Sequence, residues 1–135
     1  MTTPIRVLVV DDSAFVRKVV TEMLNRSDAV EVVGFARDGE EALELVERLH
    51  PDVITLDLVM PRMNGVEFLR ALRQRPLHRD TPVVIATSER DDSSLMQEVS
   101  QLGVAAIVKK PWKPQALASV VAQACSGRSP PIDGI

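Results

Sequence analysis

Short apolar runs alternate along the chain with segments whose apolar residues recur at helical spacing. Five runs have the length and composition of β-strands, and they lie at residues 5–12, 29–36, 52–57, 82–88 and 104–110. Each is followed by a helical stripe, of which the clearest consists of Ala42, Leu45, Val46 and Leu49. The pattern therefore predicts five strands that alternate with five helices.

Residues that favour helix ends support several of these boundaries. Asp38 and Glu41, three positions apart, resemble a capping box, and Pro51 ends the helix that they begin. Asn64 is expected to cap the next helix, and Pro114 suits the first turn of the last one. The capping signals and the apolar pattern thus agree on where the helices lie.

The first, third and fourth apolar runs are almost continuous, which predicts strands that are buried on both faces. Such strands are typical of a parallel sheet covered by helices on both sides, so we expect a doubly wound α/β domain. Ligands of these sheets bind at the carboxyl ends of the strands, where the strand order reverses. The polar residues expected at that edge are Asp11, Asp12, Asp57, Thr87, Ser88, Lys109 and Lys110.

The three carboxylates at this edge, from Asp11, Asp12 and Asp57, predict a particular chemistry. Each residue alone has a simpler explanation, such as a helix cap or a turn. Together they repel one another, by about 4 kcal/mol for two charges roughly 4 Å apart at an effective dielectric constant near 20. No histidine or cysteine is positioned to join them, so Mg²⁺ is the favoured ion. An aspartate beside such an ion can attack phosphorus and form an aspartyl phosphate.

Composition excludes several classes of protein. The 135 residues carry a net charge of −3, which argues against a nucleic-acid-binding surface, and no apolar run is long enough to span a bilayer. A single cysteine, Cys125, suits a reducing cytoplasm. His50 and His78 show no metal-ligand spacing, and we expect both on the surface.

Four segments of the chain carry a family resemblance. VLVVDDSAFVRKVV, VITLDLVMPRMNGVEFL, PVVIATS and GVAAIVKKP resemble the receiver domain of two-component response regulators, the CheY-like fold. The sequences of these segments are most similar to those of chemotaxis receivers, including the one fused to the CheB methylesterase. The resemblance covers residues 5 to about 125 and implies a flavodoxin-like sheet in the order 2-1-3-4-5. It predicts a receiver domain at residues 1–126 and a tail or linker at 127–135.

The resemblance implies a phosphoacceptor and a metal site. Asp57 would receive the phosphoryl group. Mg²⁺ would be held by Asp12, Asp57 and the main-chain carbonyl of Val59, with Asp11 acting mainly through water.

The resemblance also implies two residues that bind the phosphoryl group. Thr87 would donate its hydroxyl and so carry the signal, and Lys110 would bind a phosphoryl oxygen. Lys109 is the alternative for the lysine role, but alternation along the strand would point it away. The Lys110–Pro111 bond is expected to be cis, as in the family.

Four further positions bear on how the signal is read and lost. Ile107 stands where receivers usually have an aromatic residue, so we expect slight repacking there rather than rotation of a ring. Val59 and Glu89 occupy positions that influence loss of the phosphoryl group, and they predict slow to moderate self-dephosphorylation. Trp112 either packs beneath the fifth strand or belongs to a partner surface.

The expected function is a phosphorylation switch rather than an enzyme. A sensor histidine kinase would supply the phosphoryl group in the cytoplasm, and the switched surface would act on a downstream protein or a fused output domain. Contact with nucleic acid and insertion into a membrane are not expected. The alternative is a Mg²⁺-dependent phosphohydrolase that uses Asp57 or Asp11 as nucleophile. A nucleotide-binding domain is disfavoured, because VVDDSAF stands where a glycine-rich loop would follow the first strand.

Overall fold

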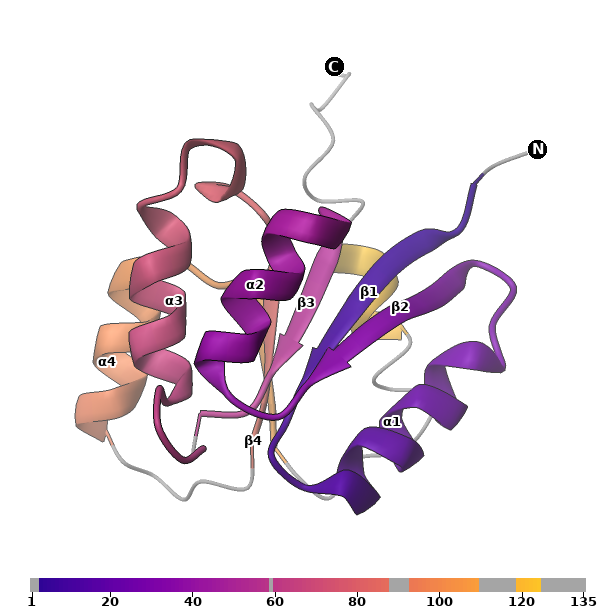
Figure 1. The fold of residues 1–135 in the computed structure, drawn as a ribbon, viewed down its shortest axis with the longest axis horizontal. Coiled ribbons are helices and arrows are strands. Elements are labelled where there is room, and N and C mark those ends of the chain that lie inside the picture. The colour runs from indigo at the N-terminus through magenta and orange to yellow at the C-terminus, as the bar shows by residue number, and fades with distance from the viewer. Residues whose placement is uncertain (1–2, 59, 88–92, 110–118, 125–135) are drawn as a thin grey trace.

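A five-stranded parallel sheet forms the centre of the protein, with its strands in the order β2-β1-β3-β4-β5 (Figure 1). The computed structural model describes residues 3–58, 60–87, 93–109 and 119–124. The strands are β1 (Ile5–Val10), β2 (Val30–Ala36), β3 (Val53–Leu56), β4 (Val83–Thr87) and β5 (Ala106–Lys109). The predicted doubly wound α/β fold and its strand order are therefore confirmed.

Helices cover both faces of this sheet. They are α1 (Ala14–Asn25), α2 (Gly39–Leu49), α3 (Gly65–Arg73) and α4 (Ser93–Leu102), with a 3-10 turn η1 (Pro76–His78) and a helical segment at residues 119–124. Figure 1 shows α2, α3 and α4 on one side of the sheet and α1 on the other. Val121 shares an apolar cluster with Val20 and Leu24, which places the segment at 119–124 on the α1 side. None of the helices within the described ranges has the length and apolar character that a bilayer span requires.

The central strands are buried on both faces, as their continuous apolar sequences predicted. All four residues of β3 and the last four residues of β1 are buried. Phe68 and Leu69 of α3 fill the core on one side of the sheet, and Val20 and Leu24 of α1 fill it on the other. A residue that follows β1 or β3 is consequently attached to a rigid base.

Side-chain caps begin α2 and α3 at the predicted residues. Asp38 accepts a hydrogen bond from the amide of Glu41 at 2.9 Å, and Asn64 accepts one from the amide of Glu67 at 2.9 Å. Glu67 completes a capping box by accepting from the amide of Asn64 at 3.0 Å, whereas Glu41 accepts from the amide of Arg37 at 2.8 Å. Both helix starts therefore have fixed positions near the carboxyl edge of the sheet.

The fifth strand is shorter than predicted. β5 begins at Ala106, whereas the apolar run begins at Val104. α4 ends at Leu102, and Gly103 adopts a left-handed φ of 86°. Because the chain must turn after α4, Val104 returns it to the sheet, and the amide of Ala105 makes the first hydrogen bond to β4, to the carbonyl of Val83 at 2.8 Å.

The prediction that both histidines lie on the surface was wrong for His78. This residue is 3% exposed, and its Nδ1 lies 2.9 Å from the hydroxyl of Thr81. Its ring stacks on that of His50, with 5.5 Å between the ring centroids. A buried imidazole is tolerated here because polar neighbours satisfy it.

Arg73 joins α3 to the connection between α4 and β5. Its guanidinium donates to the carbonyls of Thr81 at 2.8 Å, Leu102 at 3.2 Å and Gly103 at 2.7 Å. Burial lowers the pKa of Arg73 below its ordinary value, while the carboxylate of Asp80 acts in the opposite direction. An arginine remains protonated in proteins, so these are charge-assisted hydrogen bonds.

Candidate functional site

The parallel pairing of β1 with β3 brings the ends of these two strands together. Val10 pairs with Leu56, and the amide of Asp57 donates to the carbonyl of Val10 at 2.9 Å. Asp57 therefore follows β3 directly and lies beside Asp11, which follows β1. The buried strand β3 thus holds the carboxylate of Asp57 at the edge of the sheet.

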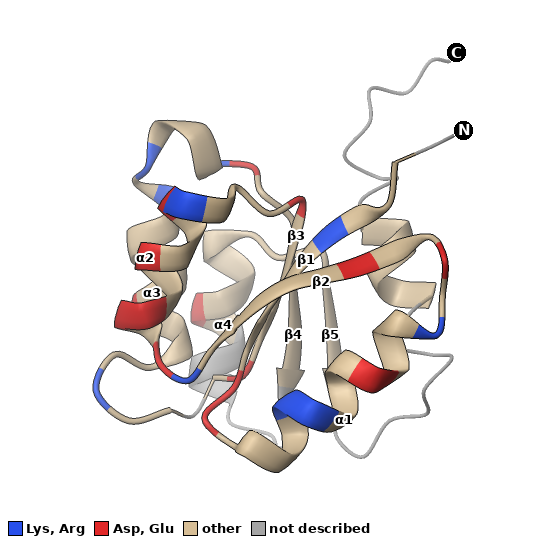
Figure 2. Cartoon of the chain, turned by 45° about the vertical axis from the view of Figure 1, so that its right-hand side comes forward, with Lys and Arg blue, Asp and Glu red and all other residues tan. Residues whose placement is uncertain are grey.

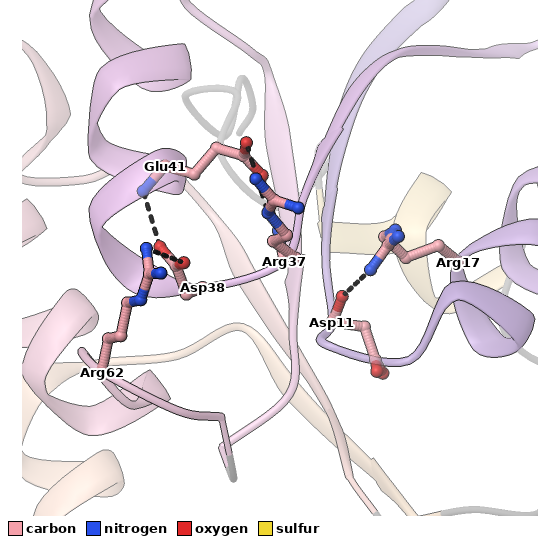
Figure 3. Close-up of polar contacts among 6 residues, drawn as sticks. All are labelled: Asp11, Arg17, Arg37, Asp38, Glu41 and Arg62. Carbon is pink, nitrogen blue, oxygen red and sulfur yellow. Dashed lines mark hydrogen bonds and ion pairs between the residues drawn. The ribbon is translucent and has the colours of Figure 1, made fainter.

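Hydrogen bonds fix Asp11 on several sides. Its amide donates to the carbonyl of Ala36 in β2 at 3.0 Å, and its carboxylate accepts from the amide of Ser13 at 2.9 Å. Its carbonyl accepts from the guanidinium of Arg17 at 2.9 Å (Figure 3). That guanidinium lies over the ring of Phe35, 5.6 Å from its centroid. These contacts connect Asp11 to β2 and to α1 although it belongs to a loop.

The carboxylates of Asp11, Asp12 and Asp57 come together at this edge, as the sequence predicted. One oxygen atom from each lies within 4.8 Å of the others. Asp11 and Asp57 are buried and Asp12 is exposed, so the cluster opens to solvent on one side. Figure 2 shows acidic residues where the chain turns from β1 into α1.

This set of ligand atoms suits Mg²⁺. The cluster offers carboxylate oxygens only, and Mg²⁺ is usually held by one or two carboxylates together with waters and phosphate oxygens. At such spacing each pair of charged carboxylates repels by about 3 kcal/mol at an effective dielectric constant near 20. A divalent cation would relieve that repulsion, and the opening beside Asp12 leaves room for its remaining ligands.

The structure describes other predicted site residues in part. Thr87 is the last residue of β4, and its main chain pairs with Lys109 of β5 at the same edge of the sheet as Asp57. The side chains of Thr87 and Lys109 are outside the described part of the structure. Ile107, which stands where receivers usually have an aromatic residue, is 39% exposed. It therefore lies at the surface of the sheet rather than in the core.

Several predictions concern residues outside the described ranges. These residues are Val59, Glu89, Lys110, Pro111, Trp112 and the segment 127–135. The metal contact of Val59, the phosphoryl contact of Lys110 and the cis bond before Pro111 stay predictions.

Gly65 is a further residue of this site, and its role comes from close packing rather than from a functional group. A Cβ atom on Gly65 would lie 2.5 Å from the carbonyl oxygen of Asp57 and 2.7 Å from the Cα of Leu58. The amide of Gly65 also donates to the carbonyl of Leu58 at 3.0 Å. The start of α3 therefore packs directly against the main chain of Asp57. The available signal was the run MPRMNG, in which Gly65 is the last residue.

The sequence matches known proteins over most of its length. Residues 7–122 match the family model of the response regulator receiver domain. Over 109 residues the chain is 50% identical to protein-glutamate methylesterase/protein-glutamine glutaminase 5 of Myxococcus xanthus (strain DK1622). That match covers 81% of this chain and 31% of the relative. The chain thus spans about a third of the length of the curated relatives that it matches.

Solved structures share the fold. The response regulator domain of Thermotoga maritima CheB superposes with a TM-score of 0.82 at 34% identity, covering 91% of this chain and 97% of that chain. A chain of the CheX–CheY–BeF3–Mg²⁺ complex from Borrelia burgdorferi has a TM-score of 0.80 at 25% identity. That match covers 89% of this chain and 88% of the other.

Proposed function

Because this chain belongs to the response regulator receiver family, we propose that Asp57 accepts a phosphoryl group and that this event switches a partner-binding surface. The observation that carries the proposal is the cluster of Asp11, Asp12 and Asp57, whose carboxylate oxygens lie within 4.8 Å of one another. Asp57 is 7% exposed, and its amide is held by β1, so its carboxylate has few orientations available. Such restriction favours attack on a bound phosphoryl donor, because less entropy is lost when the reacting atoms meet.

The proposed step is a transfer from a phosphorylated histidine of a sensor kinase. A carboxylate oxygen of Asp57 attacks phosphorus, and an O–P bond forms while the N–P bond breaks. The imidazole leaves with the bonding electron pair and takes up a proton. Hydrolysis later restores the carboxylate, since water attacks phosphorus and inorganic phosphate is released. The chain is thus modified once per cycle and is not a catalyst for external substrates.

We assign the metal site to Asp12, Asp57 and the carbonyl of Val59, with Asp11 acting through water. When bound, Mg²⁺ would neutralise charge on the phosphoryl oxygens. The all-oxygen cluster supports this assignment, as does the presence of Mg²⁺ and BeF3 in the similar complex from Borrelia burgdorferi.

We assign the phosphoryl oxygens to Thr87 and Lys110. The main chain of Thr87 ends β4 at the same edge as Asp57, which supports the first assignment. The position of Lys109, the last residue of β5, supports the second, because Lys110 follows it directly. Charge-assisted hydrogen bonds from a lysine to a phosphoryl group are among the stronger polar contacts in proteins.

The proposed output is control of a protein-glutamate methylesterase in the cytoplasm. Residues 1–126 would form the receiver, and residues 127–135 would form a tail or a linker to an output domain. The support is that the chain matches about a third of relatives named for that activity. A stand-alone adaptor that acts on a separate partner is the other form, and the mass of the natural gene product separates the two.

Incubation with acetyl phosphate and Mg²⁺ tests the proposed function. The account predicts that one phosphoryl group is added per chain. No group is added when Mg²⁺ is removed before the reaction, and none is added to an Asp57→Asn variant. Steady release of phosphate from an external ester such as p-nitrophenyl phosphate would instead favour the phosphohydrolase.

A further inference from the structure

We infer that the N-terminus of α2 is a positioning element for Asp57. Asp38 and Gly39 hold the loop before α3, residues 60–64, against the start of α2, and the start of α3 in turn packs against Asp57. Neither residue belongs to the acidic cluster. The inference rests on the proposed function, because it concerns the geometry of the same phosphoacceptor.

The first contact is a close approach of two main chains. The amide of Gly39 donates to the carbonyl of Met63 at 2.9 Å. A Cβ atom on Gly39 would lie 2.6 Å from the Cγ of Met63 and 2.8 Å from its carbonyl oxygen. Real Cβ atoms do not approach main-chain oxygens so closely, so any other residue at position 39 must displace the loop.

The second contact is an ion pair beside the first. Nη1 of Arg62 lies 3.7 Å from Oδ2 of Asp38, whose side chain is 5% exposed (Figure 3). The other carboxylate oxygen of Asp38 accepts from the amide of Glu41 and so fixes the carboxylate. Arg62 has a left-handed φ of 62°, so the loop makes a sharp turn at this residue. Because 71% of the Arg62 side chain is exposed, the ion pair is the weaker of the two contacts.

The helix that provides these contacts is itself packed into the core. Ala42 and Val46 of α2 are fully buried against the sheet. Asp38 caps the first turn, so the amide of Gly39 has a fixed direction. The N-terminus of α2 therefore fixes the position of the loop relative to the core.

The two residues that follow Met63 connect it to the main chain of Asp57. Asn64 caps α3, and Gly65 packs against the carbonyl of Asp57 with no space for a Cβ atom. A shift of Met63 thus moves the start of α3 against the main chain that carries the phosphoacceptor. Reacting groups that are misplaced by about 1 Å lose up to about a hundredfold in rate, so a small shift has a measurable effect.

A Gly39→Ala variant tests the inference, with Gly34→Ala as its matched control. The control also adds one methyl group in a tight place, 2.9 Å from Cδ1 of Leu49, but that neighbour is the end of a flexible side chain. The readouts are the Mg²⁺ dissociation constant from calorimetry, the initial rate of labelling by acetyl phosphate and the thermal midpoint. We expect Gly39→Ala to slow labelling about tenfold and to weaken Mg²⁺ binding, whereas Gly34→Ala lowers only the midpoint.

An Arg62→Asn variant tests the same inference without adding an atom to the tight contact. Asparagine tolerates the left-handed conformation, so the turn is kept while the ion pair to Asp38 is lost. Loss of a positive charge near a cation site would by itself tighten Mg²⁺ binding. A positioning role predicts the opposite sign, namely weaker binding and labelling slowed about twofold to threefold.

The outcomes separate this inference from the proposed function. If the parent protein takes up no phosphoryl group, the proposed function fails. If the parent is labelled while Gly39→Ala and Gly34→Ala behave alike, the inference alone fails. If Gly39→Ala does not fold, Arg62→Asn decides, and unchanged or tighter Mg²⁺ binding would overturn the positioning role.

Discussion

Gly65 and Asp57 meet main chain against main chain, with 2.5 Å between the carbonyl oxygen of Asp57 and the place where a side chain on Gly65 would begin. The amide of Gly65 bonds to Leu58 at the same point. The start of α3 therefore packs directly against the main chain of the phosphoacceptor, so a shift of one displaces the other. The geometry of the candidate site depends on a residue that carries no functional group.

A Gly65→Ala variant should consequently lose both stability and reactivity. The added methyl group must push α3 away from Asp57, and overpacking of this kind costs about 1–3 kcal/mol. We expect labelling by acetyl phosphate to slow by about tenfold or more, since Asp57 moves with its main chain. Urea unfolding and the labelling rate at saturating Mg²⁺ are the two measurements. Labelling at the parental rate would show that the contact has no role in reactivity.

An Asp12→Asn variant should be more stable than its parent without metal and less responsive to Mg²⁺. It removes one of three clustered negative charges, and because Asp12 is exposed the gain should be about 1 kcal/mol or less. The parent should gain about 2.7 kcal/mol when Mg²⁺ is present at about 100 times its Kd. Unfolding in EDTA and in MgCl2 measures both effects, with Asp28→Asn at an exposed position outside the cluster as control. An equal Mg²⁺ response in parent and Asp12→Asn would contradict the assignment.

An Arg73→Met variant should unfold more easily but still be labelled. Arg73 donates to partly buried carbonyls, including those of Thr81 and Leu102, and losing such charge-assisted bonds costs about 3 kcal/mol. Arg70→Met is the matched control, because Arg70 of the same helix pairs with Glu98 at a half-exposed site and should cost about 1 kcal/mol or less. Urea midpoints give the comparison, and similar midpoints for the two variants would refute the structural role of Arg73.

A Val59→Asn variant should lose its phosphoryl group faster than the parent. Valine cannot hold a water molecule for attack on phosphorus, whereas the amide of asparagine can. This prediction comes from the sequence, because Val59 lies outside the described residues. The half-life of the labelled protein after removal of acetyl phosphate is the measurement, and an unchanged half-life would count against the role of position 59.

The sequence was sufficient to predict the layers of the fold and the acidic cluster. Continuous apolar runs fixed β1 and β3, and an acid after each run placed Asp11 and Asp57 at one edge, because parallel strands end together. Such inferences need only local pattern and a general rule of topology.

The burial of His78 and the close packing at Gly39 could not be predicted in the same way. Both depend on how helices and loops that are distant in sequence meet, as His50 meets His78 and as Gly39 meets Met63. The sequence around a histidine or a glycine does not indicate which residue of a distant segment it will contact. These are also the places where packing, rather than residue type, determines the role of a side chain.

Chemical trapping of the phosphoryl group tests the central claim most directly. Sodium borohydride reduces an aspartyl phosphate to homoserine, which remains in the chain and can be located by peptide sequencing. After reaction with acetyl phosphate and Mg²⁺, the account predicts homoserine at position 57, none when EDTA replaces Mg²⁺ and none in an Asp57→Asn variant. Homoserine at another aspartate, or equal labelling of the Asp57→Asn variant, would contradict it.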